Sequence, residues 1–271
     1  MIMLKIEPRK NRSNFLEVSA PVIAVFLTMI FGGFLFLSMG KNPFEAIKLI
    51  FWDPIMSPTF SEYSRPQLVI KAAPLILIAL GLSFGFRANI WNIGAEGQYI
   101  MGALISGSIG LALYPLDSMV IFPLMILGGI IGGVLWAMIP AILKIRFNTN
   151  EILVSLMLVY VAEQILALAS VGFLRNPEGL GFPGSRDLSK YPSAANPELI
   201  ANSGIHMGVI FSIIAVIVLT YFLIYHRLGF QIKLLGQAPK ASKFSGVNSN
   251  YIIIFCLGLS GGLAGVAGMF E

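Results

Sequence analysis

The sequence predicts an all-α protein, a polytopic transmembrane helical bundle with about seven spans. Hydrophobic residues make up 56% of the 271 residues, charged residues only 11%, and the mean hydropathy is +0.83. Several apolar runs are longer than the roughly 20 residues that a membrane-spanning helix needs. Glycines recur at four-residue spacing within these runs, a pattern typical of helices that pack closely in a bilayer.

Seven apolar segments account for most of the chain. The first follows a basic N-terminus, but its length and the lack of a small-residue cleavage site argue against a signal peptide. Prolines break the following stretch, 41–67, in which 44–52 is expected to lie as a short amphipathic helix at the surface. In order, the predicted spans cover residues 14–39, 68–86, 88–113, 119–143, 150–174, 206–225 and 251–271, all within a single domain, 1–271.

The distribution of Lys and Arg predicts a cytoplasmic N-terminus, because cytoplasmic loops carry an excess of positive charge. Eleven of these residues fall in segments placed inside: Lys5, Arg9, Lys10, Arg12, Arg87, Lys144, Arg146, Arg227, Lys233, Lys240 and Lys243. Seven fall outside: Lys41, Lys48, Arg65, Lys71, Arg175, Arg186 and Lys190. The net charge of +5 therefore reflects a cytoplasmic face and gives no reason to expect nucleic-acid binding.

Segment 88–113 carries polar residues that hydrocarbon cannot solvate and that must find partners inside protein. Read as one helix, it has a row of small and polar residues at four-residue spacing: Gly94, Gln98, Gly102, Ser106 and Gly110. A second row contains Asn89, Asn92, Glu96, Tyr99, Ala103 and Gly107. Gln98 is expected to hydrogen-bond to another helix, whereas for Glu96 helix packing and a role in a translocation path or gate are equally open.

A second polar cluster, Glu163 and Gln164, lies about 20 Å along the span 150–174 at 1.5 Å per residue. An intramembrane carboxylate is a candidate for function by default, so Glu163 is expected to face a water-filled path. The candidates for a path or gate are together Asn92, Glu96, Gln98 and Glu163. Glu151 follows Asn148 by three residues and is instead expected to cap the start of its helix.

Small residues at four-residue spacing predict where helices approach one another closely. The candidates for this packing are Gly94, Gly102, Gly128, Gly132, Gly258, Gly262 and Gly265. The single Cys256 has no partner cysteine, so it is expected to be a small core residue and no disulfide or metal site is expected. The last apolar run stops at Glu271, expected to be unpaired, which is typical of a truncated product or fragment.

The cytoplasmic loop 226–250 contains a short predicted helix, 239–245. Pro239 suits the first position of a helix, and Gly246 suits the residue just past its end. Basic residues lie on one side and small or apolar residues on another: Lys240 and Lys243, and Ala241, Phe244 and Ser245. Because so short a helix is marginal alone, we expect a partner to hold it; a plain loop capped by Gly246 is the alternative.

Four blocks along the chain resemble the permease family of ABC importers for ribose and other simple sugars, nucleosides and branched-chain amino acids. They are NIGAEGQ (92–98), NEILVSLML (150–158), GQAPKASKFSGV (236–247) and LSGGLAGVAG (259–268). The proline-broken segment before the second span and the form FRANIWNIGAEGQ look most like the subfamily that serves basic-membrane-lipoprotein receptors. Many members of that subfamily import nucleosides.

The resemblance implies a permease of the bacterial inner membrane that works by alternating access. It implies three partners: a cytoplasmic ATPase, a second permease or copy of this chain, and an extracellular substrate-binding lipoprotein. The ATPase is the subunit that binds ATP. The residues implied to couple to the ATPase are Gly236, Gln237, Pro239, Lys240, Ala241, Lys243, Phe244 and Gly246. Family members usually have Ala at the position of Ser242, and they continue for several more helices.

The motifs of the main enzyme classes are missing from the sequence. It contains no phosphate-binding loop of the type G-x-x-x-x-G-K-[ST], no H-E-x-x-H and no Ser/His/Asp set in a nucleophile context. We therefore expect no enzyme activity, no cofactor and no metal in this chain. Two other classes stay open: a secondary transporter that uses Glu96 and Glu163 as ion carriers, and a membrane-embedded transferase or hydrolase. The transported ligand, nucleoside or simple sugar, also stays open.

Overall fold

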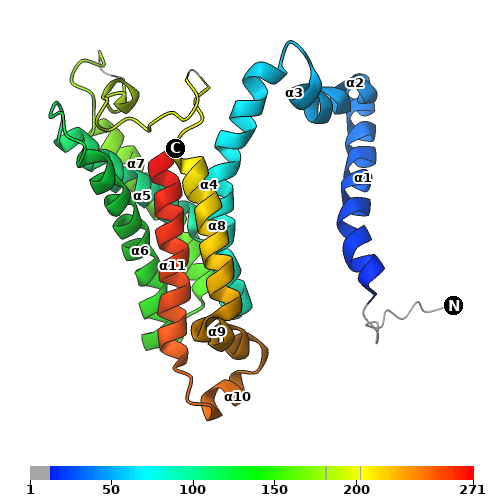
Figure 1. The fold of residues 1–271 in the computed structure, drawn as a ribbon, viewed down its shortest axis with the longest axis vertical. Coiled ribbons are helices and arrows are strands. Elements are labelled where there is room, and N and C mark those ends of the chain that lie inside the picture. The colour runs from blue at the N-terminus through cyan, green and yellow to red at the C-terminus, as the bar shows by residue number, and fades with distance from the viewer. Residues whose placement is uncertain (1–12, 181, 202) are drawn as a thin grey trace. The chain divides into compact units, whose positions relative to one another are not determined.

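The computed structural model describes residues 13–180, 182–201 and 203–271, and their regular structure is helical apart from one isolated β-bridge (Figure 1). That bridge joins Glu198 and His206. The chain divides into two compact units, residues 1–65 and 66–271. The all-α class predicted from hydropathy is therefore confirmed.

The first unit contains the apolar helix α1, Asn14–Ser38, and a run of short helices. These are α2, Pro43–Ile47, the π-helix η1, Lys48–Trp52, and α3, Asp53–Met56. Asn42 caps α2, since its Oδ1 accepts a hydrogen bond from the Phe44 backbone N–H at 3.1 Å. The predicted short helix at 44–52 is thus found within a longer helical stretch. The basic residues Lys5, Arg9, Lys10 and Arg12 lie outside the described residues.

Helix α4, Ser61–Arg87, begins seven residues before the predicted span because Pro66 does not interrupt it. A proline at this position removes one hydrogen bond, to the carbonyl of Glu62, and clashes with that turn. Glu62 is exposed, so its carbonyl can bind water instead, and the helix continues. Pro74 also lies inside α4.

The second unit contains the remaining helices. They are α5, Ala95–Ala112; α6, Ile121–Phe147; α7, Glu151–Val171; the 3₁₀-helix η2, Leu188–Lys190; α8, Met207–Tyr225; α9, Arg227–Gln237; α10, Pro239–Phe244; and α11, Ser249–Phe270. Among the described residues six helices are long and apolar enough to cross a membrane, namely α1, α4, α6, α7, α8 and α11. Helix α5 is shorter and more polar, and with it the bundle agrees with about seven spans.

Helices α5, α6 and α11 form the centre of the second unit and make its most extensive contacts with each other. Helix α11 is buried continuously from Ser260 to Phe270, as expected for a helix that is apolar on most sides. Glycines permit this close packing. A Cβ at Gly102 of α5 would overlap the backbone of Gly265 of α11, and a Cβ at Gly265 would overlap the backbone of Gly129 of α6.

The other glycines singled out for packing also lie at helix contacts. A Cβ at Gly132 would come within 2.7 Å of the carbonyl oxygen of Met101, and one at Gly128 would collide with the side chain of Ile109. Gly258 and Gly262 differ, because they meet only side-chain atoms of α6 and line an apolar cavity of about 410 Å³ between α6, α8 and α11. Their side of α11 is therefore less tightly packed than the side that carries Gly265.

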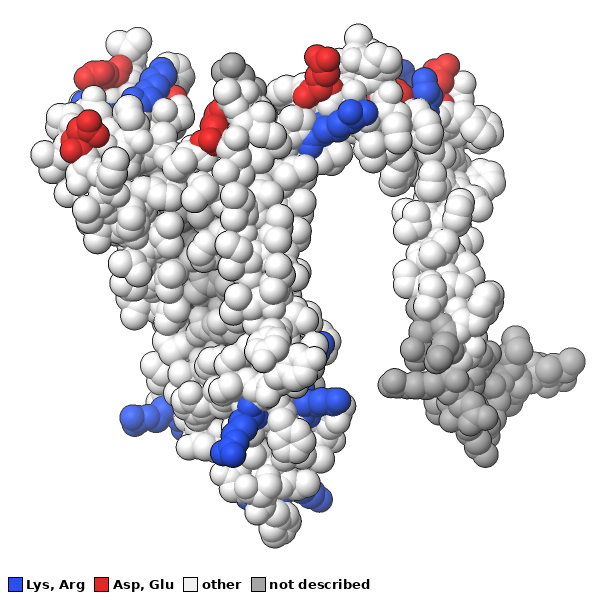
Figure 2. Space-filling model, in the orientation of Figure 1, with Lys and Arg blue, Asp and Glu red and all other residues white. Residues whose placement is uncertain are grey.

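Charge is distributed unevenly over the second unit. In the view of Figure 2, the end that carries α9 and α10 shows Lys and Arg without Asp or Glu, whereas the opposite end shows both signs. The basic end contains Arg87, Lys144, Arg146, Arg227, Lys233, Lys240 and Lys243. By the excess of positive charge in cytoplasmic loops, this end is the one expected to lie in the cytoplasm.

Two caps separate α6 from α7 and differ from the expected capping box. Asn148 ends α6 in the left-handed conformation, with φ of 51°. Asn150 caps α7, because its Oδ1 accepts a hydrogen bond from the Ile152 backbone N–H at 2.9 Å. Glu151, expected to be a capping residue, forms an ion pair with Lys144 of α6 instead. The expected capping box was therefore wrong, because α7 begins at Glu151 and its N-cap is Asn150, two residues after Asn148.

Candidate functional site

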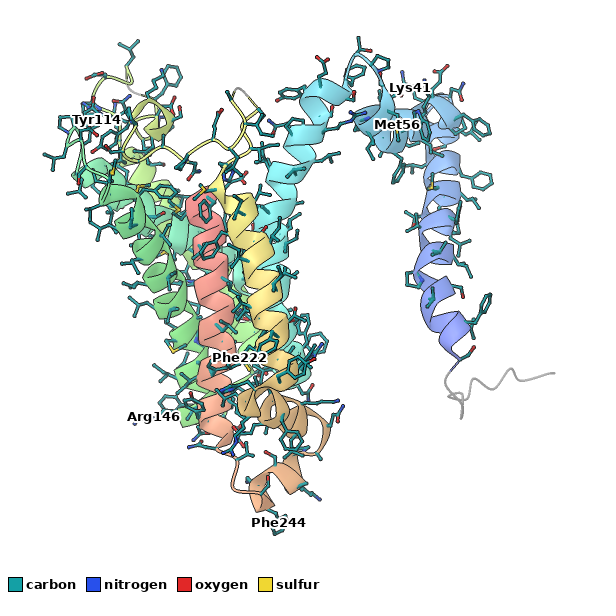
Figure 3. All side chains as sticks on the ribbon, viewed as in Figure 1. Lys41, Met56, Tyr114, Arg146, Phe222 and Phe244 are labelled. Atoms are coloured by element: carbon teal, nitrogen blue, oxygen red, sulfur yellow. The ribbon has the colours of Figure 1, made fainter. Side chains whose placement is uncertain are left out.

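The predicted short helix is present as α10, Pro239–Phe244, at the basic tip of the second unit (Figure 2). Pro239 occupies its first turn, and Gly246 follows it with φ of 75°, a conformation that favours glycine. Among its central residues only Ser242 is buried. The side chain of Phe244 is 94% exposed and extends away from the bundle (Figure 3). A large apolar side chain at the tip of a marginal helix is a feature that a protein partner would cover.

Helix α9 connects α10 to the membrane-spanning bundle. His226 caps α9, since its Nδ1 accepts a hydrogen bond from the Leu228 backbone N–H at 3.2 Å. Ile232 is fully buried, and Gly236 packs directly on the end of α4. A Cβ at Gly236 would overlap the backbone carbonyl of Arg87. Through these contacts α9 joins α10 to the end of α4.

The segment after α4, residues 88–94, is not helical, so the helix expected over 88–113 begins only at Ala95. Asn89 has φ of 57°, a left-handed conformation that breaks the helix. The two rows drawn through 88–113 at helical spacing are therefore wrong before Ala95. Within α5 the row of Gln98, Gly102, Ser106 and Gly110 is buried, as that pattern predicted.

Asn92 and Gln98 form a buried polar cluster together with Ser260 of α11. Asn92 Nδ2 donates to Gln98 Oε1 at 2.8 Å and to Ser260 Oγ at 3.0 Å, and Gln98 Nε2 donates to Asn92 Oδ1 at 3.1 Å. The same Oδ1 accepts from the Gly94 backbone N–H at 3.1 Å. The partner of Gln98 is thus a side chain of the non-helical segment rather than another helix, and Asn92 carries the contact on to α11.

Helix α7 holds the other side of this segment. The Ile93 backbone N–H donates to Ser155 Oγ at 3.2 Å. A Cβ at Gly94 would come within 2.7 Å of the Ser155 carbonyl oxygen. The segment therefore binds α5, α7 and α11 together through polar groups that are almost completely withdrawn from solvent.

Glu96 lies outside this cluster, at a cavity of about 380 Å³ between α4 and α5. The cavity is lined by Lys71, Pro74, Leu75, Ile78, Glu96, Tyr99 and Glu271. Lys71 forms an ion pair with Glu271, so the expectation that Glu271 is unpaired was wrong. The two residues lie 200 positions apart in the sequence, a distance at which no local pattern pairs them. Among the four path or gate candidates, Glu96 is the one that this cavity brings together with other charged groups.

Glu163 and Gln164 are exposed on α7. Neither has a hydrogen-bond or ion-pair partner among the described residues, so in this chain both would meet lipid or another protein. A carboxylate in hydrocarbon is costly. The expectation that Glu163 faces a water-filled path stays a prediction.

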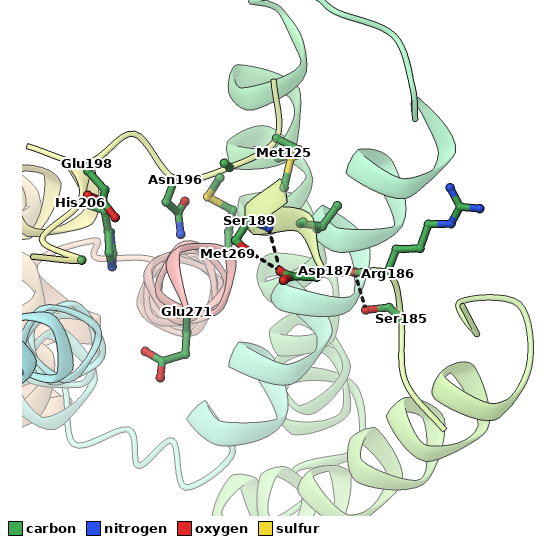
Figure 4. Close-up of a pocket in the computed structure, with 14 residues that line it drawn as sticks. Met125, Ser185, Arg186, Asp187, Ser189, Asn196, Glu198, His206, Met269 and Glu271 are labelled. Atoms are coloured by element: carbon green, nitrogen blue, oxygen red, sulfur yellow. Dashed lines mark hydrogen bonds between the residues drawn. The ribbon is translucent and has the colours of Figure 1, made fainter. Parts of the chain in front are cut away.

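The end of the bundle opposite to α10 carries a polar cavity of about 630 Å³ beneath the loop 185–206 (Figure 4). Its polar lining comprises Ser185, Arg186, Asp187, Ser189, Asn196, Glu198, His206 and Glu271. Asp187 accepts hydrogen bonds from the hydroxyl and the backbone N–H of Ser189, at 2.7 and 3.0 Å. These bonds stabilise its charged form and lower the pKa of the Asp187 carboxyl.

His206 closes the inner side of that cavity. Its ring stacks on Phe270 with centroids 5.9 Å apart, and its Nδ1 accepts a hydrogen bond from the Gly208 backbone N–H at 3.2 Å. Burial lowers the pKa of His206. The polar residues spaced along 185–206 were a signal for a cavity, but their meeting point depends on the path of the loop.

Comparison with known proteins adds a family and several relatives. The family described as branched-chain amino acid transport system / permease component matches residues 65–271. The glucose ABC transporter permease protein TsgB13 of Haloferax volcanii is 27% identical over 280 residues, which cover 100% of this chain and 72% of the relative. The nucleoside ABC transporter permease protein NupB of Lactococcus lactis subsp. cremoris is 27% identical over 262 residues, covering 93% and 70%.

A third relative, the guanosine ABC transporter permease protein NupP of Bacillus subtilis, is 26% identical over 255 residues, covering 93% of this chain and 70% of its own length. No solved structure matches the chain significantly. The relatives are named for sugars and for nucleosides, the same two ligand classes that the four sequence blocks left open.

Proposed function

Since the chain belongs to the family of branched-chain amino acid transport system permease components, we propose that it imports nucleosides, driven by a separate cytoplasmic ATPase. It is a multi-pass membrane protein and an ABC transporter permease subunit of the sugar and nucleoside type. The nucleoside is preferred over the sugar because two of the three relatives described above are named for nucleoside transport. A ribose-type sugar is the alternative substrate.

Helix α10 is the feature that supports coupling to an ATPase most directly. Its exposed Phe244 and its two exposed lysines, Lys240 and Lys243, offer an apolar tip with a basic rim to a partner. The proposed path of force runs from α10 through α9 to Arg87, on whose backbone Gly236 packs. From there the segment 88–94 continues into α5, α7 and α11.

The proposed mechanism is alternating access. When the ATPase subunits close on ATP, they displace α10, and the rigid contacts of α9 pass this movement to the segment 88–94. A shift of that segment changes how α5 and α11 pack, which closes the bundle on one face and opens it on the other. The chain itself then needs no cofactor, no metal and no covalent chemistry.

The remaining partners are a second permease or a copy of this chain and an extracellular substrate-binding lipoprotein, in a bacterial inner membrane. A second membrane subunit would give the exposed Glu163 and Gln164 a polar environment. The outer cavity at 185–206 is the proposed entrance for the ligand. Its hydrogen-bonding groups, among them Asp187 and Asn196, suit the hydroxyl and amide groups that nucleosides and sugars carry.

Reconstitution into proteoliposomes tests the proposal. The chain would be combined with its ATPase and lipoprotein in vesicles. Uptake of labelled guanosine would be measured with ATP inside the vesicles, on the side of the ATPase. We expect uptake to require ATP, to persist when a protonophore collapses the proton gradient, and to be inhibited more by unlabelled nucleosides than by free pentoses. The chain alone should hydrolyse no ATP.

A secondary transporter is the second candidate, because two membrane-level carboxylates, Glu96 and Glu163, are exposed. Uptake by the chain without any ATPase, driven by a proton gradient and abolished by Glu96→Gln, would replace the proposed function with this one. Stronger inhibition by ribose than by nucleosides would retain the ABC mechanism but change the substrate.

A further inference from the structure

A cavity of about 610 Å³ lies between the end of α4 and helix α9. It is lined by Phe86, Arg87, Asn89, Lys233, Gly236 and Gln237. The proposed transport mechanism uses only the packing of Gly236 here and leaves the polar side chains without a role. We propose that this cavity binds the headgroup of an anionic phospholipid of the inner leaflet.

The position of the cavity places it at the level of lipid headgroups. Arg87 is the last residue of the spanning helix α4, and α9 begins two residues after the spanning helix α8 ends at Tyr225. The ends of two spanning helices lie at the boundary between hydrocarbon and water. A group bound between Arg87 and Lys233 is therefore within reach of the phosphates of the inner leaflet.

The charge of the cavity is positive and uncompensated. Arg87 and Lys233 are exposed, and neither forms an ion pair among the described residues. The sequence has no Asp or Glu in 84–95 or in 226–250. None of the six residues that line the cavity carries a carboxylate, and basic pockets between helices on the cytoplasmic side typically hold anionic headgroups.

Hydrogen-bond donors complete the polar lining. Asn89 Oδ1 accepts a hydrogen bond from Trp91 Nε1 at 3.3 Å, which leaves the amide N–H groups of Asn89 to donate. The left-handed backbone of Asn89 holds this side chain beside the end of α4. The amide of Gln237 can donate or accept, and suits the glycerol hydroxyls of phosphatidylglycerol.

Two aromatic residues lie at one edge of the polar cavity, since Phe86 lines it and Trp91 packs on Phe86, and they favour a lipid over a soluble protein partner. The rings of Phe86 and Trp91 lie 4.9 Å apart, and each side chain is 45% exposed. Aromatic side chains concentrate at the membrane interface, and an amphipathic helix with basic and aromatic residues lies in that plane. The rim thus fits acyl chains and the floor fits a phosphate.

The test uses the fluorescence of Trp91, which adjoins the cavity. In the full chain, Trp52→Phe and Trp136→Phe leave Trp91 as the only tryptophan. The purified protein is titrated in detergent with phosphatidylglycerol or phosphatidylcholine carrying brominated acyl chains, which quench tryptophan on contact. We expect saturable quenching by phosphatidylglycerol and weaker quenching by phosphatidylcholine. Arg87→Gln with Lys233→Gln should weaken phosphatidylglycerol binding by about 30-fold, at about fivefold for each cation.

The control pair is Lys240→Gln with Lys243→Gln, which removes two exposed cations from α10 at the same end of the bundle. This control pair should leave phosphatidylglycerol binding unchanged. Arg87→Lys with Lys233→Arg keeps both positive charges in the pocket and should bind phosphatidylglycerol like the wild type. Equal quenching by both lipids, an equal loss in the control pair, or displacement of the lipid by inorganic phosphate would overturn the proposal. So would a pocket variant that still binds phosphatidylglycerol normally but no longer binds the ATPase.

Discussion

Asn92 and Gln98 exchange two hydrogen bonds between their side-chain amides, at 2.8 and 3.1 Å, while fewer than a twentieth of their surfaces reaches solvent. Asn92 also donates to Ser260 of α11. This reciprocal pair fixes the non-helical segment 88–94 to two helices of the bundle core. The pair lies between the proposed coupling contacts at Arg87 and the helices that would have to move. Removing the hydrogen bonds between Asn92 and Gln98 should therefore affect both stability and transport.

Gln98→Met should destabilise the fold, because Met fills the space of Gln but leaves the buried amide of Asn92 short of a donor and an acceptor. A buried polar group that loses its partner costs about 1–3 kcal/mol. Thermal unfolding of the purified protein in detergent measures the effect. The matched control is Gln164→Met on the exposed face of α7, which should leave the midpoint unchanged or raise it. Equal midpoints for the two variants would show that the amide pair contributes nothing.

Gly102→Ala should also destabilise the bundle, since the added Cβ would overlap the backbone of Gly265 and force α5 and α11 apart. Overpacking of this kind costs about 1–3 kcal/mol. Gly107 offers a control in the same helix, because a Cβ there would meet nothing within 4 Å. Gly107→Ala should be neutral or stabilising by up to about 1 kcal/mol, the difference in helix propensity. Resistance to protease in detergent, compared between the two variants, provides the measurement.

Phe244→Ala should impair transport without changing the stability of the isolated chain. The side chain is 94% exposed, so its removal costs the free protein almost nothing, whereas loss of an aromatic anchor at an interface typically weakens binding by about 2 kcal/mol or more. Binding of the purified ATPase and ATP-dependent uptake are the readouts.

Phe147→Ala is the control for this prediction, since Phe147 is also strongly exposed, at 71%, and ends α6 near the same face. It should bind the ATPase like the wild type. Ala241→Asp, which places a charge on α10, should act like Phe244→Ala and separate ATP hydrolysis from uptake. If both α10 variants transport at the normal rate, α10 is not the coupling element.

The sequence predicted those features that depend on local pattern. Hydropathy predicted where the spanning helices lie, although α4 and α5 begin seven residues away from the predicted starts, and Pro239 with Gly246 predicted α10. Both rest on rules that act within one or two turns of a helix. The row of small residues on α5 was recognised for the same reason.

Features that depend on long-range contacts could not be predicted. The segment 88–94 lies inside an apolar stretch, and the left-handed Asn89, the hydrogen bond of Ile93 to Ser155 and that of Asn92 to Ser260 hold it in a non-helical conformation. The pairing of Lys71 with Glu271 and the cavity beneath the loop 185–206 bring together residues with no common periodicity. Gln98 was expected to hydrogen-bond to another helix, but its partner is Asn92 of the non-helical segment 88–94, and no local pattern predicts that pairing.

His206 should make the stability of the protein depend on pH. Burial lowers its pKa in the folded state, with Glu271 opposing the shift, and its Nδ1 must stay unprotonated to accept from the Gly208 N–H. The folded state then binds fewer protons than the unfolded state, so the free energy of unfolding falls as the pH falls through the ordinary histidine pKa of about 6.5. His206→Asn keeps a capping oxygen but cannot titrate. It should therefore lose less stability than the wild type between about pH 7.5 and about pH 5.5, measured as thermal midpoints in detergent. His226→Asn replaces the exposed cap of α9 and retains His206, so it should keep the wild-type difference between the two pH values; a His206→Asn protein with that same difference would contradict the assignment.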